Sequence, residues 1–462
     1  MTSLRENNHA LHMSRAAFKT SDDVFNFLMG YVNVEKGQKT EFKLDRMRWL
    51  AEKLGNPQRG RLTIHVAGSK GKGSVATMCA CIAGECGYKA GLYTSPHILR
   101  WKERIALAGD EMPESILIAA AEEVLAFVDG AGPQDFPGDE LPTYFELTTL
   151  IGFCAFRLAG CDAQVIEVGM GGRLDSTNIV DPDMSVITPI ELEHTQYLGD
   201  TITKIAGEKA GIIKPGKPVC ISPQKNDAFE VFLKTSTERG SPFFNLPDII
   251  DIRDPGVSPK GTTCVLVPKG GCPAAVCSLL GKEGLAVHSP MPGRVQSQNM
   301  ALATLVCALT VPGVTREAIA KGLAAASLPA RFEPLRHDPL IIVDGAHTPA
   351  SMAATVETFE SVVQGEKTLL FGCAIDKKYR ELAGLLAPHF SDIIVTRPGS
   401  FKQSDPEVVF EAFKALGAPV EFIPDTQLAI VKAIATASER KSSLLVTGSF
   451  YLCSEVKILL GS

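Results

Sequence analysis

One glycine-rich stretch constrains this chain more than any other feature of its sequence. Residues 62–67 are apolar and rich in β-branched side chains, as expected of a buried parallel strand. The next residues, Gly68-Ser-Lys-Gly-Lys-Gly73, hold three glycines and two lysines, and a helical pattern begins at Ser74. Backbone N–H groups in such a loop, the positive end of a helix and a lysine together form a cradle for phosphate. The stretch predicts a phosphate-binding loop between a strand and a helix.

The loop departs from the standard nucleotide-binding pattern of Gly, four residues and then Gly-Lys-Ser/Thr. Val66 takes the first glycine position, and an extra glycine separates the lysine from the serine. Residues 71–76 also satisfy the dinucleotide fingerprint G-x-G-x-x-A, which expects an acidic residue about twenty positions later. The strand predicted at residues 89–93 runs instead into Thr-Ser-Pro-His. A polyphosphate is therefore favoured over a dinucleotide and over a turn that binds nothing.

Composition narrows the class of protein. The 462 residues predict two or three domains, and 45% hydrophobic with 21% charged residues is typical of a soluble globular protein. The net charge of −6 argues against nucleic-acid binding. Because no apolar run suits a spanning helix and the N-terminus is polar, we expect a cytoplasmic protein without a membrane partner. The twelve cysteines form no Cys-x-x-Cys pair, which argues against zinc and disulfides.

Strands and helices alternate from residue 62 onward, which predicts an α/β fold with a mostly parallel sheet and helices on both faces. We expect strands at 62–67, 89–93, 163–168 and 184–188, and helices at 22–31, 44–54, 74–87, 113–129, 144–159 and 200–210. A second series has helices at 298–310 and 314–325, strands at 340–343, 367–371, 392–396 and 443–447, and an edge strand at 420–423. The predicted domains are a loose extension at 1–20, a domain with the phosphate loop at 21–292 that includes a β-rich part at 243–290, and a C-terminal domain at 293–462.

Polar residues that follow the predicted strands are candidates for the chemistry, because ligands bind at the carboxyl ends of parallel strands. Glu167 ends an apolar run, and Mg²⁺ would offset the cost of a buried carboxylate, although an ion pair to Arg173 is the alternative. Lys209 alone would be a solvated helix lysine. Asp344 to His347 suits either a site or a capped turn, and Arg331 is ambiguous by itself.

Taken together, these stretches resemble the folylpolyglutamate synthase/dihydrofolate synthase family of the Mur ligase superfamily, from about Lys43 to Val456. The motifs that carry the resemblance are 65–74 (HVAGSKGKGS), 93–97 (YTSPH), 143–146 (TYFE), 167–178 (EVGMGGRLDSTN), 194–195 (HT), 198–200 (LGD), 208–214 (EKAGIIK), 296–299 (QSQN), 331–333 (RFE), 344–347 (DGAH) and 446–450 (VTGSF).

The resemblance implies a P-loop ATPase domain of the Mur-ligase central type, with a small β-rich part, followed by a smaller Rossmann-like α/β domain. It implies an ATP-dependent ligase that adds L-glutamate to 7,8-dihydropteroate and to tetrahydrofolate polyglutamates through an acyl phosphate. Cofactors would be ATP, two Mg²⁺ ions and a lysine carbamylated by CO₂. A monomer is the default expectation.

Family roles then fall on matching positions. The residues implied to bind ATP are Ser69, Lys70, Gly71, Lys72, Gly73, Ser74, Asn299, Arg331 and Asp344. Those implied to ligate Mg²⁺ are Ser95, Glu167, His194 and carbamylated Lys209. Catalysis would involve Lys72, Lys209 and His347. The pterin–benzoate site would be lined by Thr143, Tyr144, Phe145, Glu146, Leu174, Asp175 and Ser176, together with Thr40, Glu41 and Phe42.

Five positions depart from the family pattern: Lys70 replaces Asn, Glu193 replaces Asp, Val295 replaces His or Tyr, Ala330 replaces Gly and Thr348 replaces Asn. None removes an implied metal ligand or the loop lysine.

Three alternatives stay open at this point. The chain could be a folylpolyglutamate synthase only, a Mur-type amino-acid ligase, or a nucleotide-binding regulator without turnover. A Mur-type enzyme would need an additional N-terminal domain, for which about sixty residues before the loop leave no room.

Overall fold

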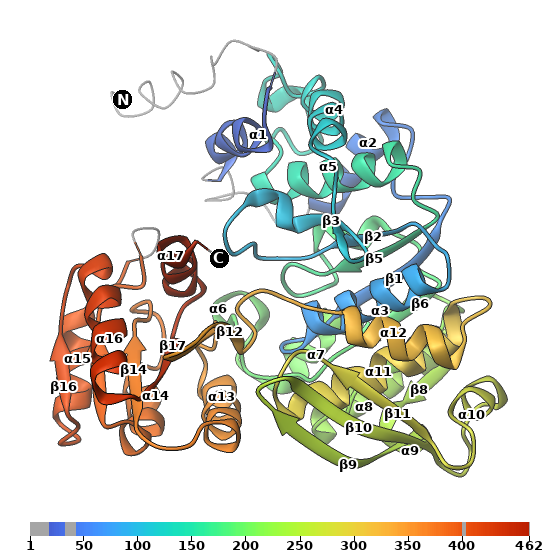
Figure 1. Cartoon of the computed structure of the whole chain (residues 1–462). Helices are drawn as coiled ribbons and strands as arrows, with labels where there is room; N and C mark the ends of the chain where they lie inside the picture. Colours follow the sequence, from blue (N-terminus) through green and yellow to red (C-terminus); the bar gives the residue numbers. More distant parts are fainter. Residues whose placement is uncertain (1–17, 33–42, 400–402, 462) are drawn as a thin grey trace. The chain divides into compact units, whose positions relative to one another are not determined.

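The computed structural model describes residues 18–32, 43–399 and 403–461 of the chain (Figure 1). It contains two compact units. Of the described residues, the first comprises 18–32, 43–251, 266–285 and 299–325, and the second comprises 252–265, 286–298, 326–399 and 403–461. No helix in the described ranges is both long and apolar enough to cross a membrane.

The first unit is built on an eight-stranded sheet with the order β4-β3-β2-β5-β1-β6-β7-β8. Its strands are β1 (Leu62–Ala67), β2 (Ala90–Tyr93), β3 (Ile105–Leu107), β4 (Asp110–Glu111), β5 (Ala163–Glu167), β6 (Met184–Ile187), β7 (Val219–Ile221) and β8 (Phe243–Asn245). The six strands from β2 to β8 in this order run parallel, and β3 and β4 add an antiparallel edge. Strand β1 lies between β5 and β6, so the residues after it lie at the middle of the sheet.

Helices flank this sheet along its length. They are α1 (Ser21–Leu28), α2 (Lys43–Lys53), α3 (Lys72–Glu85), α4 (Glu114–Leu125), α5 (Tyr144–Leu158), α6 (Thr195–Leu198), α7 (Ile202–Ala210), α8 (Asn226–Glu238), α9 (Leu246–Ile249), α10 (Ala274–Leu280) and α12 (Arg316–Ala325), with short 3₁₀ turns at 29–31, 101–104, 133–135 and 176–179. Helix α11 (Arg294–Thr310) contributes its residues from Asn299 onward to this unit. Helix α3 packs on β1, β2 and β5, and α12 packs on α3.

Two apolar clusters of described residues belong to the core of the first unit. One joins α1, α2, α4 and α5 to Tyr93 and Ile166 of the sheet. The other joins α7 and α8 to Ala67, Ile187 and Val219. Eleven consecutive residues of α3, Gly73–Ala83, are buried, because the sheet covers one side of this helix and α12 another. A helix in this position needs small and apolar residues all round rather than along one face.

A three-stranded sheet with the order β11-β10-β9 forms the β-rich part, and its strands are β9 (Ile250–Ser258), β10 (Gly261–Pro268) and β11 (Leu285–Ser289). The second unit holds a six-stranded sheet with the order β12-β13-β17-β14-β15-β16. Its strands are β12 (Glu333–His337), β13 (Leu340–Asp344), β14 (Lys367–Phe371), β15 (Asp392–Val395), β16 (Val420–Phe422) and β17 (Ser443–Thr447). Its helices are α13 (Pro349–Val362), α14 (Tyr379–Leu386), α15 (Pro406–Lys414), α16 (Thr426–Arg440) and α17 (Phe450–Leu460), with a 3₁₀ turn at 387–389.

The predicted fold class is confirmed: a mostly parallel sheet with helices, a small β-rich part and a second parallel α/β unit. The expected edge strand near residue 420 is β16, at the end of its sheet. Strands β3, β4, β7 and β8 were not predicted, since each has only two or three residues. Strand β12 was also not predicted, because its sequence EPLRH is mostly polar and contains a proline. The domain boundary at residues 292 and 293 stays a prediction.

The packing of α12 on α3 gives a test of this fold. Gly322 lies so close to α3 that a Cβ there would come within 2.6 Å of the backbone of Ile82. Because backbone atoms cannot move aside cheaply, Gly322→Ala should lower the free energy of unfolding by about 1–3 kcal/mol. Gly207 in α7 has nothing within 4 Å of the corresponding position, so Gly207→Ala should raise stability by roughly 0.5–1 kcal/mol. Denaturant unfolding of both variants checks this, and effects of the same sign would contradict the packing.

Candidate active site

Two glycines shape the loop between β1 and α3. Gly68 has a φ of 144°, and a Cβ there would come within 1.8 Å of Thr188 Oγ1. Gly71 has a φ of 83° and precedes the first turn of α3, which receives no side-chain cap. A Cβ on Gly71 would lie 2.8 Å from Asn299 Oδ1. Both positions therefore require glycine, and the helix N-terminus that they leave without a capping side chain suits phosphate.

The loop is held in place by the residues that follow β6. The N–H groups of Ser69 and Lys70 both donate to the carbonyl oxygen of Pro189, at 2.9 Å and 3.3 Å. The Ser69 hydroxyl donates to the carbonyl oxygen of Glu191 at 3.2 Å. Lys72 is half-buried at the first position of α3, and Gly73 and Ser74 after it are buried. The structure thus brings all six loop residues of the predicted ATP site and Asn299 together within the first unit.

A buried lysine lies under the loop. The Lys209 side chain is 2% exposed, and its Nζ donates to the carbonyl oxygen of Gly68 at 2.7 Å and lies 3.1 Å from Glu193 Oε1. The interpretation of Lys209 as a solvated helix lysine is therefore wrong. Burial, reinforced by the charge of Lys72, lowers the pKa of Lys209 to about 8, and Glu193 opposes this shift.

The carboxylate of Glu193 balances the lysines of this region. Burial alone would raise its pKa, but the charges of Lys72, Lys209 and Lys70 together hold that pKa below its ordinary value. Glu191, two residues earlier, responds in the opposite direction, because burial raises its pKa more than Lys70 lowers it. The site is therefore a compact set of opposite charges next to a helix N-terminus, an arrangement that can bind and polarise a phosphate chain.

Ser95 and Glu167 meet at the carboxyl ends of neighbouring strands. Glu167 is the last residue of β5 and pairs in register with Val66 of β1, one residue before Ala67. Its side chain is buried, and its Oε2 accepts a hydrogen bond of 3.0 Å from the N–H of Ser95. The alternative ion pair from Glu167 to Arg173 is wrong, because Arg173 pairs with Glu208 at 2.9 Å.

The donor atoms at these positions fit Mg²⁺. A serine hydroxyl and a buried carboxylate beside a phosphate loop match the usual magnesium site, which keeps several water molecules and phosphate oxygens. His194 is exposed, with a φ of 48°, at the start of α6. No group of three or more His, Cys, Asp or Glu side chains suited to a metal occurs in the part of the chain that the structure describes. The fit thus rests on Ser95 and Glu167, and His194 stays a prediction.

The second unit holds the other predicted ATP residues around the end of β13. Asp344 accepts hydrogen bonds from the N–H of Phe332 (2.8 Å), the N–H of Ala346 (2.9 Å) and the hydroxyl of Thr355 (2.9 Å). Burial raises the pKa of Asp344, and the nearby charge of Arg331 opposes this. The Arg331 guanidinium lies 4.6 Å from the centre of the Phe450 ring. Asp344 thus organises its own loop, and Arg331 stays beside it.

Two departures from the family pattern have visible consequences here. Ala330 adopts a φ of 52°, a conformation that favours glycine, where the family usually has glycine. Thr348 caps α13 by accepting from the N–H of Ser351, so the residue that replaces asparagine acts as a helix cap. His347 directs its Nδ1 to the carbonyl oxygen of Gly345 at 2.8 Å, and its ring packs against Phe450.

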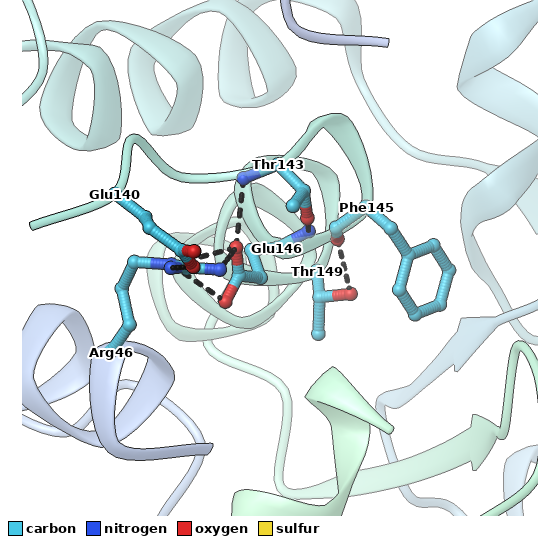
Figure 2. A network of polar contacts seen from close by, with 6 residues as sticks. All are labelled: Arg46, Glu140, Thr143, Phe145, Glu146 and Thr149. Carbon is cyan, nitrogen blue, oxygen red and sulfur yellow. Dashed lines mark hydrogen bonds and ion pairs between the residues drawn. The ribbon is translucent and has the colours of Figure 1, made fainter. Parts of the chain in front are cut away.

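Figure 2 shows that two of the predicted substrate residues serve the first turn of α5. Thr143 caps the helix by accepting from the N–H of Glu146, and Glu146 accepts from the N–H of Thr143 at 2.7 Å. The same carboxylate pairs with fully buried Arg46 at 3.0 Å, and Glu140 lies 3.3 Å from that arginine. Burial raises the pKa of Glu146, while Arg46 lowers it. Phe145 points away from this network.

The second predicted substrate segment forms a loop after β5. Asp175 accepts from the N–H of Met170 (2.9 Å), from the N–H of Thr177 (3.0 Å) and, at 2.5 Å, from the Thr177 hydroxyl. That hydroxyl lies 2.9 Å from Nε2 of His65, whose pKa burial lowers to about 3. Leu174 is half-buried and Ser176 is buried. Thr40, Glu41 and Phe42 lie outside the described residues.

Sequence reasoning missed two residues of this region. Arg46 is a charged residue of an amphipathic helix and was not singled out, yet it is 0% exposed. His65 alternates with apolar residues in β1, and its neutral buried ring was not expected. A charged residue within the apolar stripe of the helix at 44–54 was the available signal for Arg46.

Comparison with known proteins places the chain among glutamate ligases. Residues 66–307 match the Mur ligase middle domain, and residues 330–450 match the Mur ligase glutamate ligase domain. A folylpolyglutamate synthase of Lacticaseibacillus casei is 33% identical over 415 residues, which cover 87% of this chain and 94% of that protein. A dihydrofolate synthase/folylpolyglutamate synthase of Bacillus subtilis is 29% identical over 426 residues, covering 90% of this chain and 94% of that protein.

Two further comparisons bear on length and ligands. The chain is 31% identical to a probable bifunctional folylpolyglutamate synthase/dihydropteroate synthase of Haloferax volcanii. The 417 aligned residues cover 89% of this chain and 48% of that protein. The chain thus spans about half the length of that relative. A solved FPGS–AMPPCP–folate complex superposes with a TM-score of 0.79 at 28% identity, covering 96% of this chain and 100% of that one.

The ion pair of Figure 2 gives a stability test. Arg46→Met leaves the buried Glu146 carboxylate without its cation, and should cost about 3–5 kcal/mol of unfolding free energy. Adding Glu146→Gln should recover at least roughly 1 kcal/mol, because a neutral amide is cheaper to bury. Arg48 on the same helix pairs with Asp45 at an exposed position, so Arg48→Met should cost less than about 0.5 kcal/mol. Equal losses for Arg46→Met and Arg48→Met in denaturant unfolding would contradict the assignment.

Proposed function

The chain belongs to the folylpolyglutamate synthase/dihydrofolate synthase family of Mur ligases, and we propose that it joins L-glutamate to both 7,8-dihydropteroate and tetrahydrofolate polyglutamates. The observation that carries the proposal is the phosphate loop with its charged set, Lys72, Glu193 and Lys209, beside the Ser95–Glu167 pair. This arrangement suits transfer of a phosphoryl group to a carboxylate, which is the first half of an ATP-driven amide synthesis.

In the proposed reaction, an oxygen of the acceptor carboxylate attacks the γ-phosphorus of ATP, and ADP leaves. The amine of L-glutamate then attacks the acyl phosphate carbon, phosphate leaves, and the amine loses a proton. The uncapped first turn of α3 would bind the phosphates, and Lys72 would offset the charge that spreads over the transferring group. Ser95 and Glu167, with His194, would hold Mg²⁺, which supplies further charge neutralisation when bound.

The proposed contacts to ATP come from both units. In the first unit they are Ser69 to Ser74 and Asn299, which lie around Gly71. In the second unit they are Arg331 and Asp344, and His347 is proposed as a catalytic residue. Acyl phosphates hydrolyse readily, so excluding water during the two steps is part of what such a site must do.

Lys209 is proposed to carry a carbamate, R–NH–COO⁻, formed when its neutral amine attacks CO₂ and releases a proton. Two observations support this. Its pKa of about 8 leaves roughly half of the amine neutral at pH 8, whereas an ordinary lysine would have well under about 1%. Its Nζ is buried under the loop at Gly68, where a new carboxylate would face the lysines and a second Mg²⁺.

The acceptor is proposed to bind near the first turn of α5 and the loop after β5. Thr143 to Glu146 and Leu174 to Ser176 would form this site with Thr40 to Phe42. Within it, Phe145 would supply an aromatic surface, because its ring lies against Gly169 and 6.3 Å from the ring of Tyr93. Thr143 and Glu146 would act by holding that turn.

Two alternatives to the bifunctional proposal remain within reach of experiment. The L. casei relative is named a folylpolyglutamate synthase and the B. subtilis relative carries both names, so a single activity is the nearer alternative. A nucleotide-binding regulator would keep the loop but lose turnover. We still expect the protein to be a monomer and to lie in the cytoplasm.

The first test is turnover by the purified chain with ATP, Mg²⁺, L-glutamate and bicarbonate. We expect ADP and a glutamylated product, identified by mass, with either dihydropteroate or tetrahydrofolate as acceptor. Product from tetrahydrofolate alone would limit the activity to polyglutamylation. ATP binding without any product would favour the regulator.

Lys209 offers a second test of the mechanism. With ¹³C-bicarbonate at pH 8, the wild-type protein should show a carbamate carbon in its NMR spectrum, and Lys209→Met should not. The same variant should lose at least about 100-fold in kcat, because the proposed carbamate acts as a charged ligand at the reaction site. Lys204→Met on the exposed face of the same helix is the control and should keep the signal and the rate. A carbamate signal that survives in Lys209→Met would refute the assignment.

A further inference from the structure

Arg104 is the one partly buried arginine of the first unit, among the described residues, that has no oxygen acceptor. The others, Arg46, Arg61, Arg157 and Arg239, donate to carboxylate or carbonyl oxygens. The Arg104 Nε donates instead to Nδ1 of His97, at 2.8 Å. Its two terminal nitrogens have no acceptor in the described chain and stay within reach of solvent. A guanidinium in this state has its carboxylate-binding edge available.

The surroundings hold this guanidinium in one orientation. Its central carbon lies 5.7 Å from the centre of the Tyr144 ring, and His97 occupies its Nε side. Phe25 packs edge-on against both rings, at 5.4 Å from His97 and 6.4 Å from Tyr144. Because His97 Nδ1 accepts the hydrogen bond from Arg104, this nitrogen does not donate to an anion.

Arg104 is also anchored next to the proposed reaction site. Its carbonyl oxygen accepts a hydrogen bond of 3.0 Å from the N–H of Thr94, the residue before Ser95. The N–H of Ser95 in turn donates to Glu167. Tyr144, under the guanidinium, belongs to the first turn of α5, where the acceptor is proposed to bind. The backbone of Arg104 is thus tied to the strand that leads into Ser95, and its side chain lies against the first turn of α5.

We propose that Arg104 binds the α-carboxylate of the terminal glutamyl residue of a folate acceptor, the carboxylate that does not react. The planar edge of a guanidinium matches a carboxylate with two parallel hydrogen bonds. Such pairing would weaken the reacting γ-carboxylate as a nucleophile, so the non-reacting group is the better partner. The aromatic side chains around Arg104 favour an acceptor with an aromatic body over free L-glutamate.

The inference rests on the proposed function and gives the site a role in specificity. Dihydropteroate has one carboxylate, which must react, whereas a folate has a second one on the same glutamyl unit. An arginine that binds this second carboxylate would strengthen the binding of folates and leave the binding of dihydropteroate largely unchanged. It would also place each newly added glutamate in the same way in successive rounds.

The test compares tetrahydrofolate with its α-amide, in which the α-carboxylate is replaced by a carboxamide, on wild type and Arg104→Met. With wild type, the amide should lower kcat/KM by about 10- to 100-fold, the usual range for a charge-assisted hydrogen bond. Arg104→Met should show a similar loss with tetrahydrofolate, and little further loss with the amide. This non-additivity is the signature of direct contact. KM for ATP and for L-glutamate should stay within about twofold.

Arg100→Met is the matched control, since Arg100 lies four residues earlier and pairs with Glu111 at an exposed position. Arg100→Met should leave kcat/KM unchanged with both acceptors. The temperature of thermal unfolding should be the same for wild type and for both variants. The assignment of Arg104 would be overturned by any of three results with Arg104→Met: an equal loss of kcat/KM with both acceptors, a raised KM for L-glutamate, or no loss of kcat/KM at all. Wild type that glutamylates neither acceptor would instead overturn the proposed function, and equilibrium binding of the two acceptors would still test Arg104 alone.

Discussion

The space around Gly68 is the constraint on which the first unit depends. Thr188 Oγ1 would collide with any Cβ at this position, and Lys209 Nζ donates to its carbonyl oxygen at 2.7 Å. Three chain segments that are far apart in sequence therefore meet at one peptide unit: the end of β1, the residues after β6 and the end of α7. A side chain at residue 68 would separate all three, and with them the start of α3. The glycine is required by packing as much as by the need to approach a phosphate closely.

This meeting point explains how charge can be buried there. A lysine that is 2% exposed is costly unless it is paired, and its pKa of about 8 measures part of that cost. Glu193 and the Gly68 carbonyl offset the cost, whereas Lys72 adds to it. Lys72 and Lys209 thus lie close enough to repel each other beside the N-terminus of α3. An anion with several negative charges relieves the repulsion between Lys72 and Lys209, so electrostatics and packing favour the same class of ligand.

The sequence predicted the sheets well because buried parallel strands are short runs of mostly apolar residues, as in β13 and β17, and because a glycine loop marks the end of β1. It predicted the phosphate loop for the same reason. Short strands such as β3 and β4 escaped, since two or three residues carry no periodicity. The burial of Lys209 escaped because the pattern of a helix does not tell which neighbours cover its polar face. The roles of Thr143 and Glu146 in a capping box were readable from their spacing, but the pairing of Glu146 with Arg46, a hundred residues away, depends on the tertiary fold alone.

The first turn of α5 shows how a fold separates structural from functional polarity within four residues. Thr143 and Glu146 face inward, where one closes the capping box and the other neutralises Arg46 (Figure 2). Their neighbours Tyr144 and Phe145 face other partners, the guanidinium of Arg104 and the backbone at Gly169. The buried ion pair thus stiffens the turn, and this stiffness sets where the two rings lie. A motif of four consecutive residues can be required for function although only its two middle members are placed to meet a ligand, because the outer pair determines the direction of the inner pair.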